Sequence, residues 1–277
     1  MAIRMEAAQE HLGERFKIER EISHTGMATV FLAEDLQEAR RVAVKILQPE
    51  FAATIGATRF HREIRILARL DHPNILPLLH SDEAGPLLYY VAPYAGTDLR
   101  TRLMDETQLP LEEALEITRQ VAAALDYAHA HNILHRDIKP GNILLDGDRA
   151  LVCDFGIARA IEVAAGDSLS SSGLIVGTPT YMSPEQARHE EDIDGRADIF
   201  SLGCVLYEML VGEPPFSGPT IQAVIARITK EPPPKIRVVR PDVPQHVEAA
   251  VEAALAKAPI DRPQTAAELV WRLDETS

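Results

Sequence analysis

The chain carries a set of polar residues whose types and spacing suit phosphate chemistry. Asp137, Lys139 and Asn142 lie in one short segment, and Asp154 follows after a stretch that is mostly apolar. A carboxylate beside a hydroxyl can accept or orient its proton, and carboxylate and amide oxygens are ligands that Mg²⁺ prefers. The set therefore predicts a phosphoryl-transfer centre, with Asp137 beside the nucleophile and with Asn142 and Asp154 as metal ligands.

The order of these motifs resembles that of bacterial (eukaryotic-like) serine/threonine protein kinase catalytic domains. His135-Arg136-Asp137 and Asp154-Phe155-Gly156 match the family's catalytic and metal-binding motifs, and the resemblance covers about residues 16–271. It implies ATP and Mg²⁺ as cofactors, with Mn²⁺ as the alternative ion. It also implies transfer of the γ-phosphoryl group to Ser or Thr hydroxyls of proteins. Lys139 resembles the lysine that serine/threonine kinases direct at the γ-phosphate.

A lysine and a glutamate upstream complete the catalytic residues that the resemblance implies. Lys45 shares a predicted strand face with Ala43 and Leu47, so its ammonium needs an anionic partner. Glu63 lies on the apolar stripe of a predicted helix, where an unpaired carboxylate is costly. In the family, the matching lysine holds the α- and β-phosphates and the glutamate orients it. The alternative is a solvated Lys and Glu that never meet.

The loop that covers the nucleotide phosphates departs from the family pattern. Ser23, Thr25 and Ala28 stand at the three glycine positions of the family's Gly-rich loop. Glycine favours this role because a backbone without Cβ takes positive φ and approaches phosphate closely. We therefore expect weaker nucleotide affinity with the chemical step intact. The whole loop comprises Ile22, Ser23, His24, Thr25, Gly26, Met27, Ala28, Thr29 and Val30.

The resemblance also places the adenine base. Residues 90–95 match the family's hinge, in which the carbonyl of Pro93 and the N–H of Ala95 would pair with the purine edge. Val30, Ala43 and Leu144 match the apolar residues that sandwich the ring. Asp154 completes the predicted nucleotide site through its metal ion.

The segment after Asp154 resembles an activation loop. Arg136 matches the arginine that pairs with a phosphate on this loop, and Thr178 matches the threonine placed against the catalytic residues. For any single serine, a plain flexible linker is the better interpretation. The candidate phosphate acceptors are Ser168, Ser170, Ser171 and Ser172.

Hydrophobic periodicity predicts an α+β fold with two lobes, and the resemblance identifies it as the bilobal protein-kinase fold. Alternating apolar residues predict antiparallel strands at 16–20, 30–33, 42–46, 75–79 and 87–91, with one main helix near 60–67. Helical spacing dominates afterwards, at 111–131, 194–211, 219–230, 243–257 and 265–271. The expected division is an N-lobe at 1–92, a hinge at 93–96 and a mostly α-helical C-lobe at 97–277.

Composition excludes several classes of protein. With 28 Lys and Arg against 42 Asp and Glu, the net charge of −14 argues against a nucleic-acid binder. Two cysteines are too few for a disulfide scaffold and fit a reducing compartment. The N-terminus lacks the apolar core of a signal peptide, and no apolar stretch is long enough to span a membrane. A cytoplasmic location is expected, although a membrane anchor beyond residue 277 is compatible with the sequence.

Two other functions compete with an active protein kinase. A pseudokinase, which binds nucleotide as a scaffold or regulatory module, would explain the altered loop, but the retained Lys45, Asp137, Asn142 and Asp154 argue against it. A small-molecule kinase is disfavoured by the activation loop and its Ser183-Pro184-Glu185 ending. As partners we expect protein substrates, together with self-association for autophosphorylation in trans.

Overall fold

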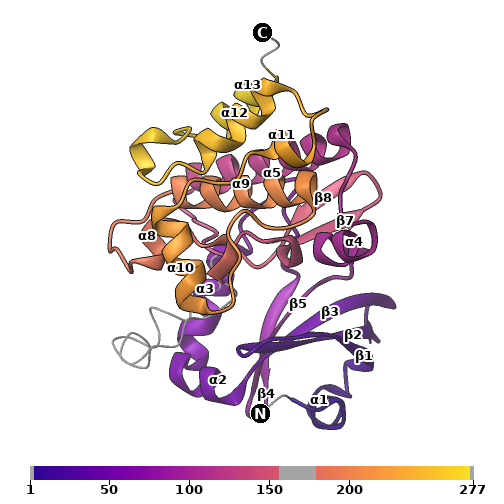
Figure 1. Ribbon diagram of the computed structural model, residues 1–277. Coiled ribbons are helices and arrows are strands. Elements are labelled where there is room, and N and C mark those ends of the chain that lie inside the picture. The colour runs from indigo at the N-terminus through magenta and orange to yellow at the C-terminus, as the bar shows by residue number, and fades with distance from the viewer. Residues whose placement is uncertain (1–2, 156–178, 275–277) are drawn as a thin grey trace. The chain divides into compact units, whose positions relative to one another are not determined.

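The computed structural model describes residues 3–155 and 179–274, and these divide into two compact units (Figure 1). The first unit contains residues 3–71 and 76–95, and the second contains 72–75, 96–155 and 179–274. Five predicted regulatory residues and one predicted side chain lie outside the described part of the chain. They are Ser168, Ser170, Ser171, Ser172, Thr178 and the side chain of Glu63.

The first unit is built on a five-stranded antiparallel sheet with the strand order β1-β2-β3-β5-β4. Its inner strands are rich in Val, Ile and Leu, which suits strands covered on both faces. The strands are β1 (Phe16–His24), β2 (Ala28–Asp35), β3 (Arg40–Leu47), β4 (His80–Ala84) and β5 (Leu87–Pro93).

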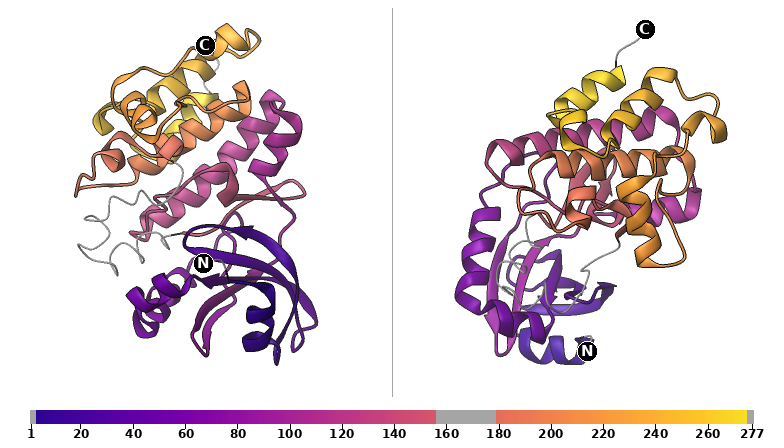
Figure 2. Two further views of the ribbon diagram at one scale, coloured as in Figure 1. Left: turned by 60° about the horizontal axis from the view of Figure 1, so that its bottom comes forward. Right: turned by 60° about the vertical axis from the view of Figure 1, so that its left-hand side comes forward.

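Among the residues that the structure describes, three helices accompany this sheet. α1 (Met5–Leu12) covers one face, where Ala8 and Leu12 join a buried core with Phe16 and Phe31. The side chain of Gln9 fixes α1 to β1, because it accepts the Ile18 N–H at 2.8 Å and donates to the Phe16 carbonyl at 3.2 Å. α2 (Pro49–Ile55) and α3 (Ala57–Leu67) follow β3, and α3 packs against β4 and β5 (Figure 2).

One predicted strand is wrong in position. The sequence indicated a strand at residues 75–79, whereas the corresponding strand, β4, begins at His80. Pro77 lies inside the predicted stretch and has no N–H to donate to a sheet, which explains the shift. Only the Leu79 N–H, which donates to the Val91 carbonyl at 2.8 Å, reaches β5 from this stretch.

The second unit is mostly helical and is organised around α5 (Leu111–Ala130) and α9 (Arg196–Val211), which pack against each other (Figure 2). Every residue of α9 from Ala197 to Val211 is buried, as expected for a helix that is mostly apolar around its circumference. The other helices are α4 (Leu99–Glu106), α8 (Pro184–Ala187), α10 (Ile221–Lys230), α11 (Ile236–Val239), α12 (Gln245–Ala254) and α13 (Ala266–Asp274), with 3₁₀ turns η1 (Pro140–Asn142), η2 (Pro179–Tyr181) and η3 (Pro259–Asp261).

A small sheet in the second unit carries the motifs of the predicted site. Its strands are β6 (Thr97–Asp98), β7 (Ile143–Asp146) and β8 (Arg149–Val152), in that order. The hairpin of β7 and β8 lies between Asn142 and Asp154, where the sequence is mostly apolar. A sheet unit and a mostly helical unit agree with the expected α+β class. Within the described residues, no helix is long and apolar enough to cross a membrane.

Candidate active site

Loop 135–142 is held by a buried carboxylate from the first turn of α9. Asp198 accepts the His135 N–H at 2.9 Å and the Arg136 N–H at 2.7 Å, and its Oδ2 lies 2.8 Å from Nε2 of His129. Complete burial acts to raise the pKa of this carboxyl, but the hydrogen bonds from His129 and from the His135 N–H outweigh it, and the pKa lies below its ordinary value. Asp198 is therefore an anion at neutral pH, and it fixes where the loop begins.

His135 fastens the loop from inside. Its side chain is fully buried, its Nδ1 accepts the Asp137 N–H at 3.2 Å, and its Nε2 lies 2.8 Å from the Cys153 carbonyl. An imidazole that accepts at Nδ1 carries its proton on Nε2, so the second contact is a donated hydrogen bond. The ring also packs edge-on against Phe155 at 4.7 Å between centroids. His135 thus connects the backbone of Asp137 to the segment that contains Asp154.

Three predicted catalytic side chains meet in this loop. Nζ of Lys139 lies 2.7 Å from Oδ2 of Asp137, and Nδ2 of Asn142 donates to the same oxygen at 3.0 Å and to the Asp137 carbonyl at 2.7 Å. About 30% of the Asp137 side chain remains exposed, so a hydroxyl can reach it. The arrangement presents a carboxylate oriented by two donors, with a cation beside it. Such a group can orient an attacking hydroxyl and accept its proton.

Asn142 and Asp154 suit a hard cation. The hydrogen bonds of Asn142 to Asp137 use its amide nitrogen, which leaves the amide oxygen uncommitted to them. Asp154 follows β8 with φ of 66°, and the N–H of its neighbour Cys153 donates to the Asn142 carbonyl at 3.0 Å. An amide oxygen and a carboxylate on adjoining segments fit Mg²⁺, which keeps several waters and takes few protein ligands. The described residues contain no cluster of three or more His, Cys, Asp or Glu arranged for a metal.

Lys45 lies in the first unit, on β3. It is half-buried and faces Val30 of β2 and Tyr90 of β5 across the sheet. Its Nζ lies 5.8 Å from the centroid of the Tyr90 ring. Glu63, the predicted partner, lies on α3, and its side chain is outside the described part of the structure.

Comparison with known proteins decides the family. The family model described as the protein kinase domain matches residues 16–271 of the sequence. The chain belongs to the protein kinase domain family. The family and the bilobal α+β fold expected from the motifs are thereby confirmed. Protein kinases use ATP with a divalent cation, and the donor pair Asn142 and Asp154 fits that requirement.

The chain is similar to proteins named as bacterial serine/threonine kinases. The chain is 41% identical over 267 residues to serine/threonine-protein kinase PknB of Mycolicibacterium smegmatis, covering 94% of this chain and 42% of that protein. It is 40% identical over 266 residues to PknB of Mycobacterium tuberculosis H37Rv, with the same coverage of both chains. A probable serine/threonine-protein kinase of Streptomyces coelicolor is 37% identical over 265 residues, covering 93% of this chain and 39% of the relative. This chain therefore spans about two fifths of the length of these relatives.

The altered glycine loop of this kinase domain forms the turn between β1 and β2. Ser23 pairs with Val30, and His24 pairs with Thr29, so the strands continue almost to the tip. Oγ1 of Thr25 accepts the N–H groups of Met27 and Ala28 at 3.3 and 3.2 Å. The Thr25 N–H donates to the Ala28 carbonyl at 2.9 Å. A side-chain hydroxyl thus occupies backbone donors at the tip of the loop.

The predicted adenine-contacting residues are divided between the two units. Val30 and Ala43 lie on adjacent strands β2 and β3, and Ala43 pairs with Ala92 of β5. Pro93 ends β5, and Ala95 follows it in the first unit. Leu144 lies in the second unit on β7. Ile22, at the start of the loop, is exposed on β1.

The segment that follows the predicted activation loop is firmly anchored. Ser183 and Gln186 form a reciprocal capping box at the start of α8. Glu185 makes two hydrogen bonds of 2.7 Å with Arg262, which also donates to the carbonyls of Arg196, Ala256 and Lys257. All five N–H groups of this buried guanidinium are therefore paired.

Sequence reasoning missed a second buried network. The hydroxyl of Tyr181 donates to Glu208 of α9 at 2.5 Å and accepts a hydrogen bond from Arg100 of α4, which also donates to Glu208 at 2.7 Å. Burial, reinforced by Glu208, raises the pKa of the Tyr181 hydroxyl. No sequence signal links these residues, since they come from three elements far apart in the chain.

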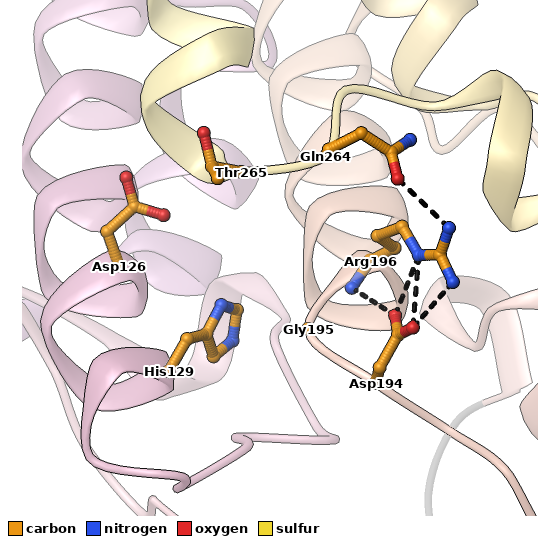
Figure 3. A pocket seen from close by; sticks show the side chains of 7 residues that line it. All are labelled: Asp126, His129, Asp194, Gly195, Arg196, Gln264 and Thr265. Atoms are coloured by element: carbon orange, nitrogen blue, oxygen red, sulfur yellow. Dashed lines mark hydrogen bonds and ion pairs between the residues drawn. The ribbon is translucent and has the colours of Figure 1, made fainter.

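A pocket of about 550 Å³ lies in the second unit, and Asp137 is not among the residues that line it (Figure 3). The side chain of His129 points into it, while its Nε2 contacts Asp198. The charged groups that line the pocket already have partners: Arg196 pairs with Asp194, and Asp126 accepts two N–H groups from the start of α13. We therefore assign no ligand to it. The residues that line the pocket are Asp126, His129, Asp194, Gly195, Arg196, Gln264 and Thr265.

Proposed function

We propose that this chain is the catalytic domain of a serine/threonine protein kinase, which transfers the γ-phosphoryl group of Mg-ATP to Ser or Thr hydroxyls of proteins. The observation that supports this most strongly is the cluster of Asp137, Lys139 and Asn142. In it, one carboxylate oxygen lies within 3.0 Å of both an ammonium and an amide. The names of the bacterial relatives support the same activity.

In this proposal each residue has a distinct role. Asp137 orients the substrate hydroxyl and takes its proton, while Lys139 neutralises charge that develops on the transferred group. Asn142 and Asp154 hold the divalent cation, for which we favour Mg²⁺ over Mn²⁺. When bound there, the cation would supply positive charge against the phosphates, and the role of Asn142 and Asp154 would be to hold it in place. Lys45, oriented by Glu63, binds the α- and β-phosphates.

The proposal also assigns the lobes of the domain, its phosphorylation sites and its compartment. We assign residues 1–92 to the N-lobe, 93–96 to the hinge and 97–277 to the C-lobe. The acceptors for autophosphorylation are sought among the serines at 168–172, with Arg136 as the phosphate-binding residue and a second copy of the chain as the phosphorylating partner. Two free cysteines and the use of ATP favour the cytoplasm as the compartment.

A pseudokinase remains the alternative, because Thr25 occupies backbone donors in the phosphate-covering loop. Its discriminating test is incubation with γ-labelled ATP, Mg²⁺ and a mixed Ser-, Thr- and Tyr-containing protein substrate, followed by phosphoamino-acid analysis. An active kinase yields labelled phosphoserine or phosphothreonine. A pseudokinase binds the nucleotide and yields no label, and labelled phosphotyrosine would overturn the assigned specificity.

A further inference from the structure

The peptide group that enters Asp137 is held by a side chain from α8. Arg136, the preceding residue, has φ of 66°, in the left-handed region that is unfavourable for a residue with a long side chain. Its N–H donates to Asp198, and its carbonyl accepts a hydrogen bond of 2.8 Å from Nε2 of Gln186. That carbonyl belongs to the peptide linking Arg136 to Asp137. Gln186 therefore fixes the orientation of the peptide plane that precedes Asp137, and with it the direction of the Asp137 side chain.

Gln186 is itself held rigidly. Its Oε1 accepts the Ser183 N–H at 3.0 Å, and its own N–H donates to Oγ of Ser183 at 3.4 Å. Because the oxygen is committed to Ser183, the amide nitrogen is the atom that faces Arg136. A flipped amide would place two oxygens against each other. The adjacent Glu185 ties α8 to the buried Arg262, so the support behind Gln186 is firm.

We propose that Gln186 is a positioning residue for the catalytic aspartate, and that it acts through the carbonyl of Arg136. This inference rests on the proposed function. Asp198 holds the nitrogen side of Arg136 and Gln186 holds its carbonyl side, so the unfavourable backbone of this residue is constrained from two different elements. Without the Gln186 donor, the peptide can rotate, and the carboxylate of Asp137 loses its alignment with a hydroxyl.

Three substitutions separate this role from helix capping. Gln186→Glu keeps an oxygen for the Ser183 N–H but removes the donor to Arg136, and glutamate is a favoured residue at this position of a capping box. Gln186→Leu removes both contacts without adding a charge. Ser183→Ala is the matched control, because it weakens the cap and keeps the contact between Gln186 and Arg136.

The kinetic test measures kcat and the KM for ATP in all four proteins, with the melting temperature as a check on folding. Removing one partner of a half-buried hydrogen bond should lower kcat about ten-fold in both Gln186 variants, and the KM for ATP should stay within about two-fold. Ser183→Ala should keep a kcat within about two-fold of wild type. A wild-type kcat in Gln186→Glu, or an equal loss in Ser183→Ala, would overturn the inference.

Hydrogen exchange provides a readout that does not need activity. Amides in a peptide covering residues 135–142 should exchange faster in Gln186→Glu than in wild type and Ser183→Ala, while α9 remains unchanged. Unchanged exchange in this peptide would refute the positioning role even if kcat falls. Should the wild-type chain transfer no phosphate, the proposed function fails, and the exchange comparison alone decides the inference.

Discussion

Asp198 accepts the backbone N–H of Arg136 at 2.7 Å, although the two residues are 62 positions apart in the chain. The contact joins a buried helix to a residue with left-handed backbone angles, immediately before Asp137, to which we assign the catalytic role. Since such a conformation persists only where surrounding contacts over-determine it, the geometry of Asp137 depends on a charge that no substrate touches.

Replacing Asp198 should therefore impair both folding and catalysis. Asp198→Asn places an amide donor where the carboxylate accepts two backbone N–H groups and His129. We expect a loss of about 3 kcal/mol in the free energy of unfolding, measured by urea denaturation, and a lower rate of phosphoryl transfer. Asp194→Asn is the control, because the Asp194 side chain, which pairs with Arg196, is 53% exposed and the pair should contribute less than about 1 kcal/mol.

The Asp198 carboxylate should account for part of the loss of stability at acid pH. The pKa of Asp198 is lowered below its ordinary value of 3.8 by folding. Its stabilising contribution is therefore complete above that value and is lost as the pH falls through the folded pKa. In Asp198→Asn the free energy of unfolding should fall less steeply over this range. An acid limb identical to that of wild type would contradict the role given to this group.

The pair of Glu185 and Arg262 should dominate the stability of the segment around α8. Arg262→Lys cannot reproduce five N–H bonds, and Glu185→Gln leaves the guanidinium without its charge partner. Each substitution should lower the free energy of unfolding by about 3–5 kcal/mol. Removing Arg188, whose ion pair with Glu190 is almost half exposed, should change it by less than about 1 kcal/mol. Similar losses at both positions would show that burial does not decide the contribution.

The hydroxyl of Thr25 should weaken nucleotide binding, because it occupies the N–H groups of Met27 and Ala28. Thr25→Gly frees these donors and permits positive φ, so it should tighten ATP binding about five-fold, measured by calorimetry with a non-hydrolysable analogue and Mg²⁺. Ser23→Gly should add to the effect. Thr25→Ser retains the hydroxyl and should bind like wild type. If the glycine and serine variants bind equally, the hydroxyl has no such role.

Lys257 should make the free energy of unfolding depend on pH in the alkaline range. Burial lowers the pKa of its amine to about 8, and Nζ lies 3.9 Å from the centroid of the Phe216 ring, with no hydrogen-bond acceptor in the described part of the chain. The native state then binds fewer protons than the unfolded state between about pH 8 and the ordinary pKa of 10.5, so this lysine adds stability as the pH rises. The aromatic face favours the ammonium and moderates the effect.

Lys257→Met isolates this contribution. The difference in free energy of unfolding between the two proteins should shift in favour of wild type as the pH rises from about 7 to about 10. Taking the difference cancels the titration of groups common to both, including the thiol of Cys204, whose pKa is raised by burial. A difference that stays constant over this range would show that the amine is not perturbed in the fold.

The sequence was sufficient for the parts of the site that lie close together in the chain. Asp137, Lys139 and Asn142 fall within one loop, so their spacing alone predicts their meeting. Alternating apolar residues located β1, β2, β3 and β5, because a half-buried strand must repeat with period two. The long helices α5 and α9 were equally clear from their apolar spacing.

Contacts between distant segments were not predictable from local patterns. α1 has only a short apolar stripe, and its place depends on the hydrogen bonds of Gln9 to β1. The contact of Gln186 with Arg136 and the bond between Tyr181 and Glu208 depend on tertiary packing. Amino-acid composition and hydrophobic periodicity carry no information about such pairs. The site of a kinase can thus be recognised from its motifs, whereas the residues that hold it in place require the structure.

The central claim is that Asp137 performs phosphoryl transfer in an otherwise intact nucleotide site. The most direct test measures two quantities in wild type and Asp137→Asn: the rate of transfer from γ-labelled ATP to a protein substrate, and the affinity for Mg-ATP. We predict that the substitution abolishes transfer, by at least about a hundred-fold, while affinity changes less than about three-fold. Equal transfer rates in the two proteins, or no transfer by wild type despite saturating nucleotide, would contradict the claim.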